Sequence, residues 1–159
     1  MSPERPLALL TGAGGGIGSG VGRMLAARGY QVIAVDRDEG SAERAASAIG
    51  DGAIGVACDG TDRAQVSALA SRIRGEWSDR LEVIVCNAGV IVPGNVIEAR
   101  DEDLYLQTDV MLASVLPLLA AAATVMRERG RGRILATVSL GGVLALPGSA
   151  AYSAAKAGL

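Results

Sequence analysis

Short apolar runs and longer amphipathic stretches alternate along the chain. The apolar runs lie at residues 7–10, 31–35, 53–58, 81–86 and 133–138, and each has the length of a strand. The stretches between them, at about residues 17–28, 41–49, 62–77 and 101–129, have the length of helices, and another begins near Ser149. Strands that are apolar throughout are buried on both faces. The pattern therefore predicts an α/β fold, a doubly wound, Rossmann-like parallel sheet of about five strands.

Local signals mark the expected ends of several helices. Ser41 is the expected N-cap of the second helix, either Thr61 or Asp62 caps the third, and Gly29 ends the first. Pro117 is expected to kink the long fourth helix, because proline lacks an N–H and crowds residue 113.

Composition narrows the class of protein. The chain has 159 residues, 50% of them hydrophobic and 20% charged, which predicts a single globular domain over residues 1–159. The net charge is −2 and the basic residues are mixed with acidic ones, so we expect no nucleic-acid partner. Histidine is absent, which removes His-based triads and most zinc sites, and no metal site is expected.

Cysteine usage and hydropathy bear on the compartment. Cys58 and Cys86 form no CxxC motif and sit in apolar runs, so they are expected to be buried free thiols of a cytoplasmic protein. The polar start, Met1–Pro6, has no signal-peptide core. The apolar stretch Val110–Met126 is about three residues short of a membrane span and contains a proline, so we expect a buried or interface helix and no membrane partner.

Polar residues and glycines directly follow the predicted strands, and they are Thr11, Gly12, Asp36, Asp59, Asn87 and Ser139. The carboxyl ends of parallel strands share one edge of the sheet, where ligands bind. Within the run from Thr11 to Gly18, glycines 12, 16 and 18 lie between a strand and a helix, which suits a backbone cradle for a diphosphate. Taken alone, the run also fits a tight turn without a ligand.

Asp36 ends the second strand 18 residues after Gly18, close to the ~20-residue spacing at which a carboxylate meets the adenosine ribose. A carboxylate there accepts hydrogen bonds from the ribose hydroxyls and repels a 2′-phosphate. Asp36 therefore favours NAD(H) over NADP(H). Arg37 could instead meet a phosphate, and a solvated aspartate at a strand end remains the alternative.

Tyr152 and Lys156 are four residues apart, on one face of the last predicted helix. A phenol is a poor acid or base at neutral pH unless a neighbouring cation stabilises the phenolate. Ser139 could hold a substrate carbonyl or hydroxyl beside the phenol. An ordinary half-exposed tyrosine and a surface lysine would show the same spacing.

Together, the glycine-rich run, Asn87-Ala88-Gly89, Ser139 and Tyr152-(x3)-Lys156 resemble the short-chain dehydrogenases/reductases over almost the whole chain. The resemblance implies an NAD(H)-dependent oxidoreductase that interconverts a secondary alcohol and a ketone. It also implies a homo-oligomer, dimer or tetramer. Tyr152 would be the acid/base, Lys156 would assist it and bind the nicotinamide ribose, and Ser139 would position the substrate.

The resemblance also implies the cofactor contacts. The glycine-rich turn would hold the pyrophosphate, and Asp59 with the backbone of Gly60 would contact adenine. Asn87 would brace the sheet centre, while Ala88 and Gly89 would lie against the cofactor. The residues expected to bind the cofactor are Gly12, Gly14, Gly15, Gly16, Ile17, Gly18, Asp36, Arg37, Asp59, Gly60, Asn87, Ala88, Gly89, Tyr152 and Lys156.

Two departures from the family pattern matter. Met111 stands where members usually carry an asparagine that supports a water relay to the lysine, and a thioether cannot replace an amide. Members are also longer, so we expect either a natural chain that continues or a second polypeptide that completes the fold. The fifth strand would be an exposed apolar edge, and a short final helix would be marginal.

Two alternatives to the enzyme therefore stay open: a catalytically silent NAD-binding or scaffolding protein, and an inactive fragment. The loop Leu140–Leu146 is mostly small and apolar, which points to a modestly hydrophobic alcohol or ketone as substrate.

Overall fold

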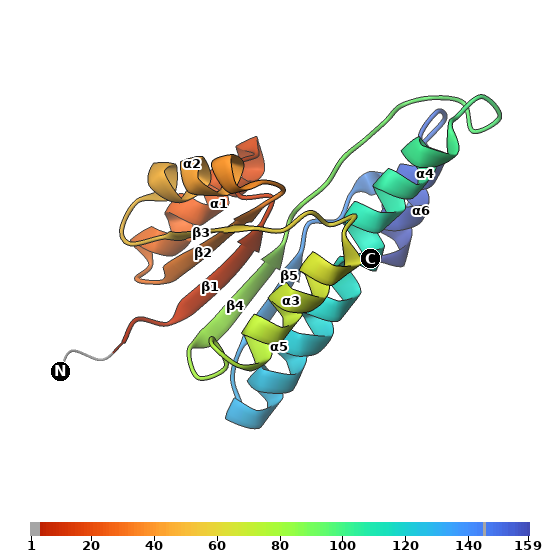
Figure 1. The fold of residues 1–159 in the computed structure, drawn as a ribbon. Coiled ribbons are helices and arrows are strands. Elements are labelled where there is room, and N and C mark those ends of the chain that lie inside the picture. Colours follow the sequence, from red (N-terminus) through yellow and green to blue (C-terminus); the bar gives the residue numbers. More distant parts are fainter. Residues whose placement is uncertain (1–3, 145) are drawn as a thin grey trace.

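The five predicted strands form one parallel sheet in the computed structural model, which describes residues 4–144 and 146–159. The strands are β1 (Leu7–Thr11), β2 (Gln31–Asp36), β3 (Ile54–Ala57), β4 (Leu81–Cys86) and β5 (Arg133–Ala136). Their order in the sheet is β3-β2-β1-β4-β5, and every neighbouring pair is parallel (Figure 1). The predicted α/β, Rossmann-like fold is confirmed.

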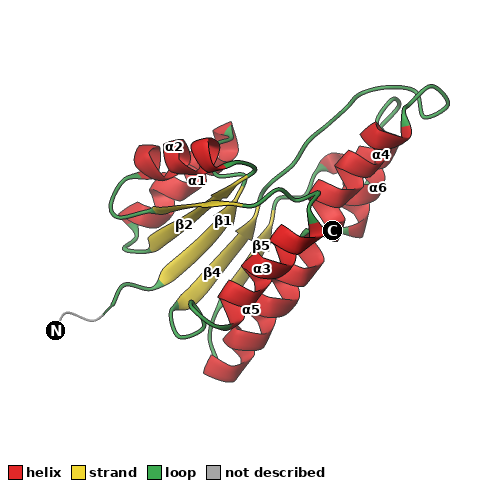
Figure 2. Cartoon of the chain, in the orientation of Figure 1, coloured by secondary structure: helices red, strands yellow, loops and turns green. Residues whose placement is uncertain are grey.

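Helices cover both faces of this sheet, as Figure 2 shows. One face carries α1 (Gly16–Ala27) and α2 (Glu39–Ile49), and the other carries α3 (Arg63–Arg74) and α5 (Val115–Arg129). The remaining helices are α4 (Asp101–Thr108), which precedes a π-helical turn (Asp109–Ala113), and α6 (Ala150–Gly158), which follows a 3₁₀ turn (Leu140–Gly142).

The alternation of side chains along each central strand builds two cores. In β1, Leu7 and Leu9 pack with α3 and α5, whereas Ala8 and Leu10 pack with α1 and α2. The core on the α3 side also contains Trp77. Small alanines dominate the other core, which lets α1 and α2 lie close to the sheet.

The two edge strands depart from the prediction that all strands are buried on both faces. Ile54 in β3 is 41% exposed, and Ile134 and Leu135 in β5 are 44% and 48% exposed. Neither strand has a described neighbour on its outer side. The expected exposed apolar edge at the fifth strand is therefore present.

Two predicted helix ends need correction. The N-cap of α2 is Asp38 and not Ser41, because Asp38 has an extended backbone and its carboxylate accepts the N–H of Ser41 at 2.9 Å. Asp62, one of the two expected caps, accepts the N–H groups of residues 64 and 65 and begins α3. That helix ends at Arg74, so Trp77 lies in the turn beyond it, with its ring 4.3 Å from the Arg72 guanidinium.

A π-helical turn interrupts the long fourth helix just before Pro117, the residue predicted to kink it. Its backbone widens into the π-helical turn, where the Ser114 N–H bonds the Asp109 carbonyl at 2.9 Å, and Ala113, which would accept from an N–H at residue 117, ends that turn. By length and composition alone, the helical region Asp101–Arg129, which contains an 18-residue window with a mean hydropathy of 1.9, could cross a membrane. Here α5 packs against α3 and the sheet through Val115, Leu118 and Val125.

The last helix is better supported than its length predicted. Gly142 of the 3₁₀ turn lies directly against the Lys156 backbone, and Gly158 lies against Leu112. Ala155 and Lys156 are buried. Neighbouring elements therefore hold α6 in place. A short isolated helix would lack these contacts. The residues Met1–Pro3, and Ala145 of the loop 140–146, lie outside the described part of the chain.

Candidate nucleotide and catalytic site

The glycine-rich run forms a tight turn between β1 and α1. Gly12 has a φ of +65°, and a Cβ on it would lie only 2.8 Å from the Cα of Ala88. A side chain at Gly18 would collide with the carbonyl of Gly12. Glycine is required at both positions because three backbone segments meet there.

The amino end of α1 suits an anion. Its N-cap, Gly15, offers no side-chain acceptor, whereas α2 and α3 are capped by Asp38 and Asp62. No described atom lies within 4 Å of where a Cβ on Gly16 would stand, and Gly15, Gly16 and the next residues line an open cavity. The first N–H groups of α1 therefore face space that a diphosphate can fill.

A second layer of hydrogen bonds ties the strand ends together beneath this turn. The Thr11 hydroxyl accepts the N–H groups of Asn87 and Ala88, at 3.0 and 3.1 Å. The Asn87 amide donates to the carbonyls of Thr11 and Gly12, both at 3.2 Å, and accepts the Thr137 hydroxyl at 3.1 Å. Asn87 thus links the ends of β1, β4 and β5.

Two cavities of about 430 and 450 Å³ open at the carboxyl ends of the strands. The first runs from Thr11 past Asp36, Arg37, Asp59 and Gly60. The second is lined by Gly12, Gly15, Gly16, Ile17, Gly18, Asp36, Asn87, Ala88, Gly89, Tyr152 and Lys156, among others. Gly12, Asp36, Ala88 and Gly89 line both. The structure therefore brings most of the predicted residues into one continuous region.

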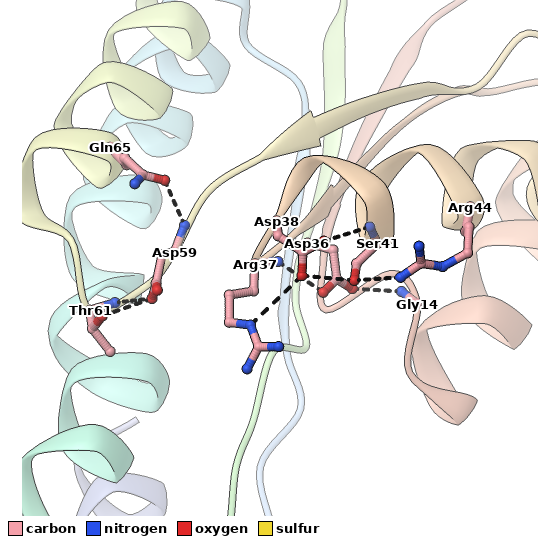
Figure 3. A network of polar contacts seen from close by, with 9 residues as sticks. All are labelled: Gly14, Asp36, Arg37, Asp38, Ser41, Arg44, Asp59, Thr61 and Gln65. Carbon is pink, nitrogen blue, oxygen red and sulfur yellow. Dashed lines mark hydrogen bonds and ion pairs between the residues drawn. The ribbon is translucent and has the colours of Figure 1, made fainter. Parts of the chain in front are cut away.

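The two carboxylates of the first cavity are held by nearby donors (Figure 3). Asp36 accepts the N–H of Gly14 and the N–H of Arg37, each at 2.8 Å. Asp59 accepts the Thr61 N–H and hydroxyl at 2.9 and 2.8 Å. Gly14 does not line either cavity, so its place in the site is to fix Asp36. Each carboxylate keeps lone pairs for a ligand's hydroxyl or amino groups.

Lys156 is only 6% exposed, and its ammonium lies 5.9 Å from the centre of the Tyr152 ring. It donates to the Thr137 carbonyl at 2.6 Å. Burial is the main influence on the pKa of Lys156 and lowers it. The sequence reasoning missed Thr137, although it directly follows the fifth strand as Asn87 follows the fourth.

Met111 and Lys156 both lie close to Gly89. The Met111 sulfur and the Lys156 Nζ are 3.7 and 3.8 Å from the position that a Cβ on Gly89 would occupy. Met111 is fully buried in the π-helical turn and does not line either cavity. The residue that departs from the family pattern is therefore near Gly89 but outside the cavity that Lys156 lines.

Ser139 lies at the start of the 3₁₀ turn. It does not line either cavity, and its hydroxyl accepts a hydrogen bond from the Gly141 N–H at 3.1 Å. Gly141 connects it to the phenol, since a Cβ on Gly141 would lie 3.2 Å from a Tyr152 ring carbon. Ser139 therefore reaches Tyr152 through this turn.

The two cysteines are free thiols, as expected, but only Cys86 is buried and Cys58 is partly exposed. Cys58 lines the first cavity, and burial raises its pKa to about 11. Burial also raises the pKa of Cys86, to about 12, so neither thiol is a nucleophile at neutral pH. Residues 4–144 and 146–159 contain no group of three or more metal-ligating side chains.

Comparison with known proteins agrees with this geometry. The model of a family described as short chain dehydrogenase matches residues 6–159. The 3-oxoacyl-[acyl-carrier-protein] reductase FabG of Escherichia coli (strain K12) is 33% identical over 159 residues, which are 100% of this chain and 65% of that protein. The chain thus spans about 65% of the length of this curated relative.

Two solved structures carry dinucleotides. A metagenomic short-chain oxidoreductase in complex with NADP is 31% identical with a TM-score of 0.88, over 97% of this chain and 71% of that one. An NAD⁺-bound xylitol dehydrogenase is 25% identical with a TM-score of 0.86, over 96% and 60%. With the family match over nearly every residue, the chain belongs to the short-chain dehydrogenase/reductase family of oxidoreductases.

Proposed function

We propose that this chain forms the nucleotide-binding and catalytic part of an NAD(H)-dependent oxidoreductase that interconverts a secondary alcohol and a ketone. One observation carries the proposal: Tyr152 and Lys156 line the same cavity as the glycine-rich turn. A phenol, an ammonium and an anion-binding helix end are thereby within reach of one dinucleotide.

The uncapped amino end of α1 would bind the pyrophosphate, with Gly15 and Gly16 leaving it room. Asp36 would accept hydrogen bonds from the adenosine ribose, and Asp59 would accept one from the adenine amino group. Lys156 would donate to the nicotinamide ribose. A bound nicotinamide supplies or takes up the hydride in such reactions.

In the direction of ketone reduction, Tyr152 would donate its hydroxyl proton to the carbonyl oxygen, and the resulting phenolate would regain a proton from solvent. In the direction of oxidation, the same oxygen would accept the proton of the alcohol. The Lys156 ammonium, 5.9 Å from the centre of the Tyr152 ring, would assist Tyr152 in either direction, as the family resemblance implies. Ser139 would position the substrate oxygen from the 3₁₀ turn.

NAD(H) is the proposed cofactor because the Asp36 carboxylate is held at the end of β2 by two N–H groups. A fixed carboxylate repels the 2′-phosphate of NADP(H). The NADP complex and the NAD⁺ complex among the solved relatives differ in cofactor, so relationship alone does not decide this choice.

A modestly hydrophobic substrate fits the exposed apolar side chains of Leu140, Val143 and Leu146 beside the site. FabG of E. coli reduces a 3-oxoacyl group, as its name states, which is also a ketone on an apolar chain. The two free thiols, of which Cys86 is buried, support a cytoplasmic setting.

A catalytically silent NAD-binding protein is the second candidate. The observation in its favour is Met111, whose thioether is buried near Gly89 and offers no strong hydrogen bond. This candidate predicts NADH binding with no turnover across a panel of secondary alcohols and ketones. If the chain is an inactive fragment, we expect neither NADH binding nor turnover. An upward shift of a cooperative thermal unfolding transition by NADH would contradict the inactive fragment.

The test of the proposal is Tyr152→Phe, with Tyr105→Phe as a matched control. Tyr105 is 66% exposed on α4 and lines neither cavity, so its loss should change nothing. Tyr152→Phe should lower kcat by at least about 10²-fold, because the proton donor is lost. NADH binding, measured by fluorescence, should stay within about twofold of the parent chain. Unchanged turnover would refute the assignment of Tyr152.

A further inference from the structure

A polar network at the start of α2 borders the first cavity (Figure 3). Asp36 and Arg37 line the cavity, and the Arg37 side chain is 78% exposed. The Asp36 carboxylate is fixed by backbone N–H groups, so its position does not depend on any cation. The preference of this site for a ribose hydroxyl or a ribose 2′-phosphate therefore also depends on the charged side chains next to Asp36.

Asp38 is connected to both nearby arginines. Its carboxylate is 3.8 Å from the Arg37 guanidinium and accepts the Ser41 hydroxyl at 2.9 Å. The Ser41 hydroxyl in turn accepts a hydrogen bond from the Arg44 guanidinium at 3.0 Å. Figure 3 shows Arg37 and Arg44 approaching Asp38 from opposite sides.

The backbone helps to hold Arg44 in this place. Gly40 has no side chain, and the Arg44 guanidinium is 3.1 Å from where a Cβ on Gly40 would stand. Gly14 lies close to Asp36 and to the Ser41 carbonyl, at 3.1 and 3.8 Å from its Cβ position. Arg44 thus folds back toward the first turn of α2.

We propose that Asp38 is a specificity-determining residue that sets the dinucleotide preference, by holding Arg37 in an ion pair, and Arg44 through the Ser41 hydroxyl, away from a ribose 2′-phosphate. The inference rests on the nucleotide site of the proposed function. With Asp38 charged, the two arginines are offset by Asp36 and Asp38, and the site has no net cation for a phosphate. Without that charge, one positive charge is in excess, and the Arg37 guanidinium beside the cavity is free to bind a phosphate.

The test is Asp38→Asn, which removes the charge and keeps an N-cap side chain that can still accept the Ser41 N–H. The readout is binding of two nucleotides that differ only in the 2′-phosphate, adenosine 2′,5′-bisphosphate and 5′-AMP, by calorimetry on the full chain. The bisphosphate should bind about five- to tenfold more tightly than to the parent chain, and 5′-AMP should change by less than about twofold. High salt should reduce the gain.

Glu39→Gln is the matched control, because it makes the same change in net charge one residue away, at an exposed carboxylate with no ion pair among the described residues. It should leave the ratio of the two affinities unchanged. Adding Arg37→Gln to Asp38→Asn should remove the gain.

Three results would overturn the inference about Asp38: equal changes for both nucleotides, an equal gain with Glu39→Gln, or a gain that survives loss of Arg37. Failure of the parent chain to bind either nucleotide would instead refute the nucleotide site itself. Because the readout is nucleotide binding and not turnover, a loss of catalytic activity cannot be mistaken for a change in nucleotide preference.

Discussion

Lys156 is the residue at which stability and the proposed chemistry oppose each other. The residue is only 6% exposed, and its ammonium donates a hydrogen bond to the Thr137 carbonyl. A buried cation disfavours the folded state, yet a phenolate beside it would be stabilised.

Replacing Lys156 with methionine should therefore raise stability at neutral pH and abolish turnover. Burial lowers the pKa of Lys156 below its ordinary 10.5, so between the two values the unfolded chain binds more protons and the parent chain gains stability as pH rises. The stability advantage of the methionine variant over the parent chain should therefore narrow as the pH rises toward 10.5. Urea unfolding at several pH values measures it, and an advantage that does not vary with pH would show that burial of the charge is not the cause.

Two glycines of the first turn are expected to have different roles, Gly12 in stability and Gly16 in nucleotide binding. Gly12→Ala should destabilise the chain by about 2–4 kcal/mol, because its φ is +65° and Ala88 is in contact. Gly16→Ala should leave stability unchanged or slightly raised, because its surroundings are open. It should weaken NADH binding instead, since the added methyl group enters the cavity. The same stability loss in both variants would contradict this division.

At this scale the sequence predicts residues that belong to local motifs. Gly12, Asp36, Tyr152 and Lys156 are recognised from spacing along the chain, and all line the cavities. Thr137 was missed because its contacts with Asn87 and Lys156 join strands and a helix that are distant in sequence.

Helix caps show the same limit for whole elements. Ser41 and Asp38 both have side chains suited to an N-cap, and only the backbone path leaving β2 decides that Asp38 takes the position. The π-helical turn is similar: Pro117 predicts an interruption, but its form depends on packing Met111 and Ser114 into the core.

The cap of α3 gives a prediction for an element. Asp62→Ala should lower the midpoint of thermal unfolding by a few degrees at neutral pH, whereas Asp62→Asn should lower it less. The N–H of Gln65 is the main cause that lowers the pKa of Asp62 below 3.8, so the stabilisation is present above that pH and is lost as pH falls through the lowered value. The parent and the alanine variant should therefore converge in acid, and a constant difference would contradict a charged cap.

On the scale of the whole molecule, α5 has two different faces. Val115, Leu118 and Val125 are buried against the α3 side of the sheet. On the solvent side, an exposed stripe of small or apolar residues begins at Ala113 in the π-helical turn and continues along α5 through Leu116, Ala120 and Ala123. A stripe of this kind suits close packing with a second helix, as expected for the homo-oligomer that the family resemblance implies.

Leu116→Glu should therefore reduce the molar mass measured by light scattering to that of one chain. Leu116 is 55% exposed at the centre of the stripe, and a buried carboxylate without a partner would disfavour association. Ile97→Glu, at an 86% exposed residue outside the helix, is the control and should leave the oligomer intact. The same run Asp101–Arg129 is apolar enough to enter a membrane, so the parent chain should also be mixed with phospholipid vesicles. Vesicle binding that Leu116→Glu abolishes, with no change in molar mass, would mean that the stripe faces lipid and not a second copy.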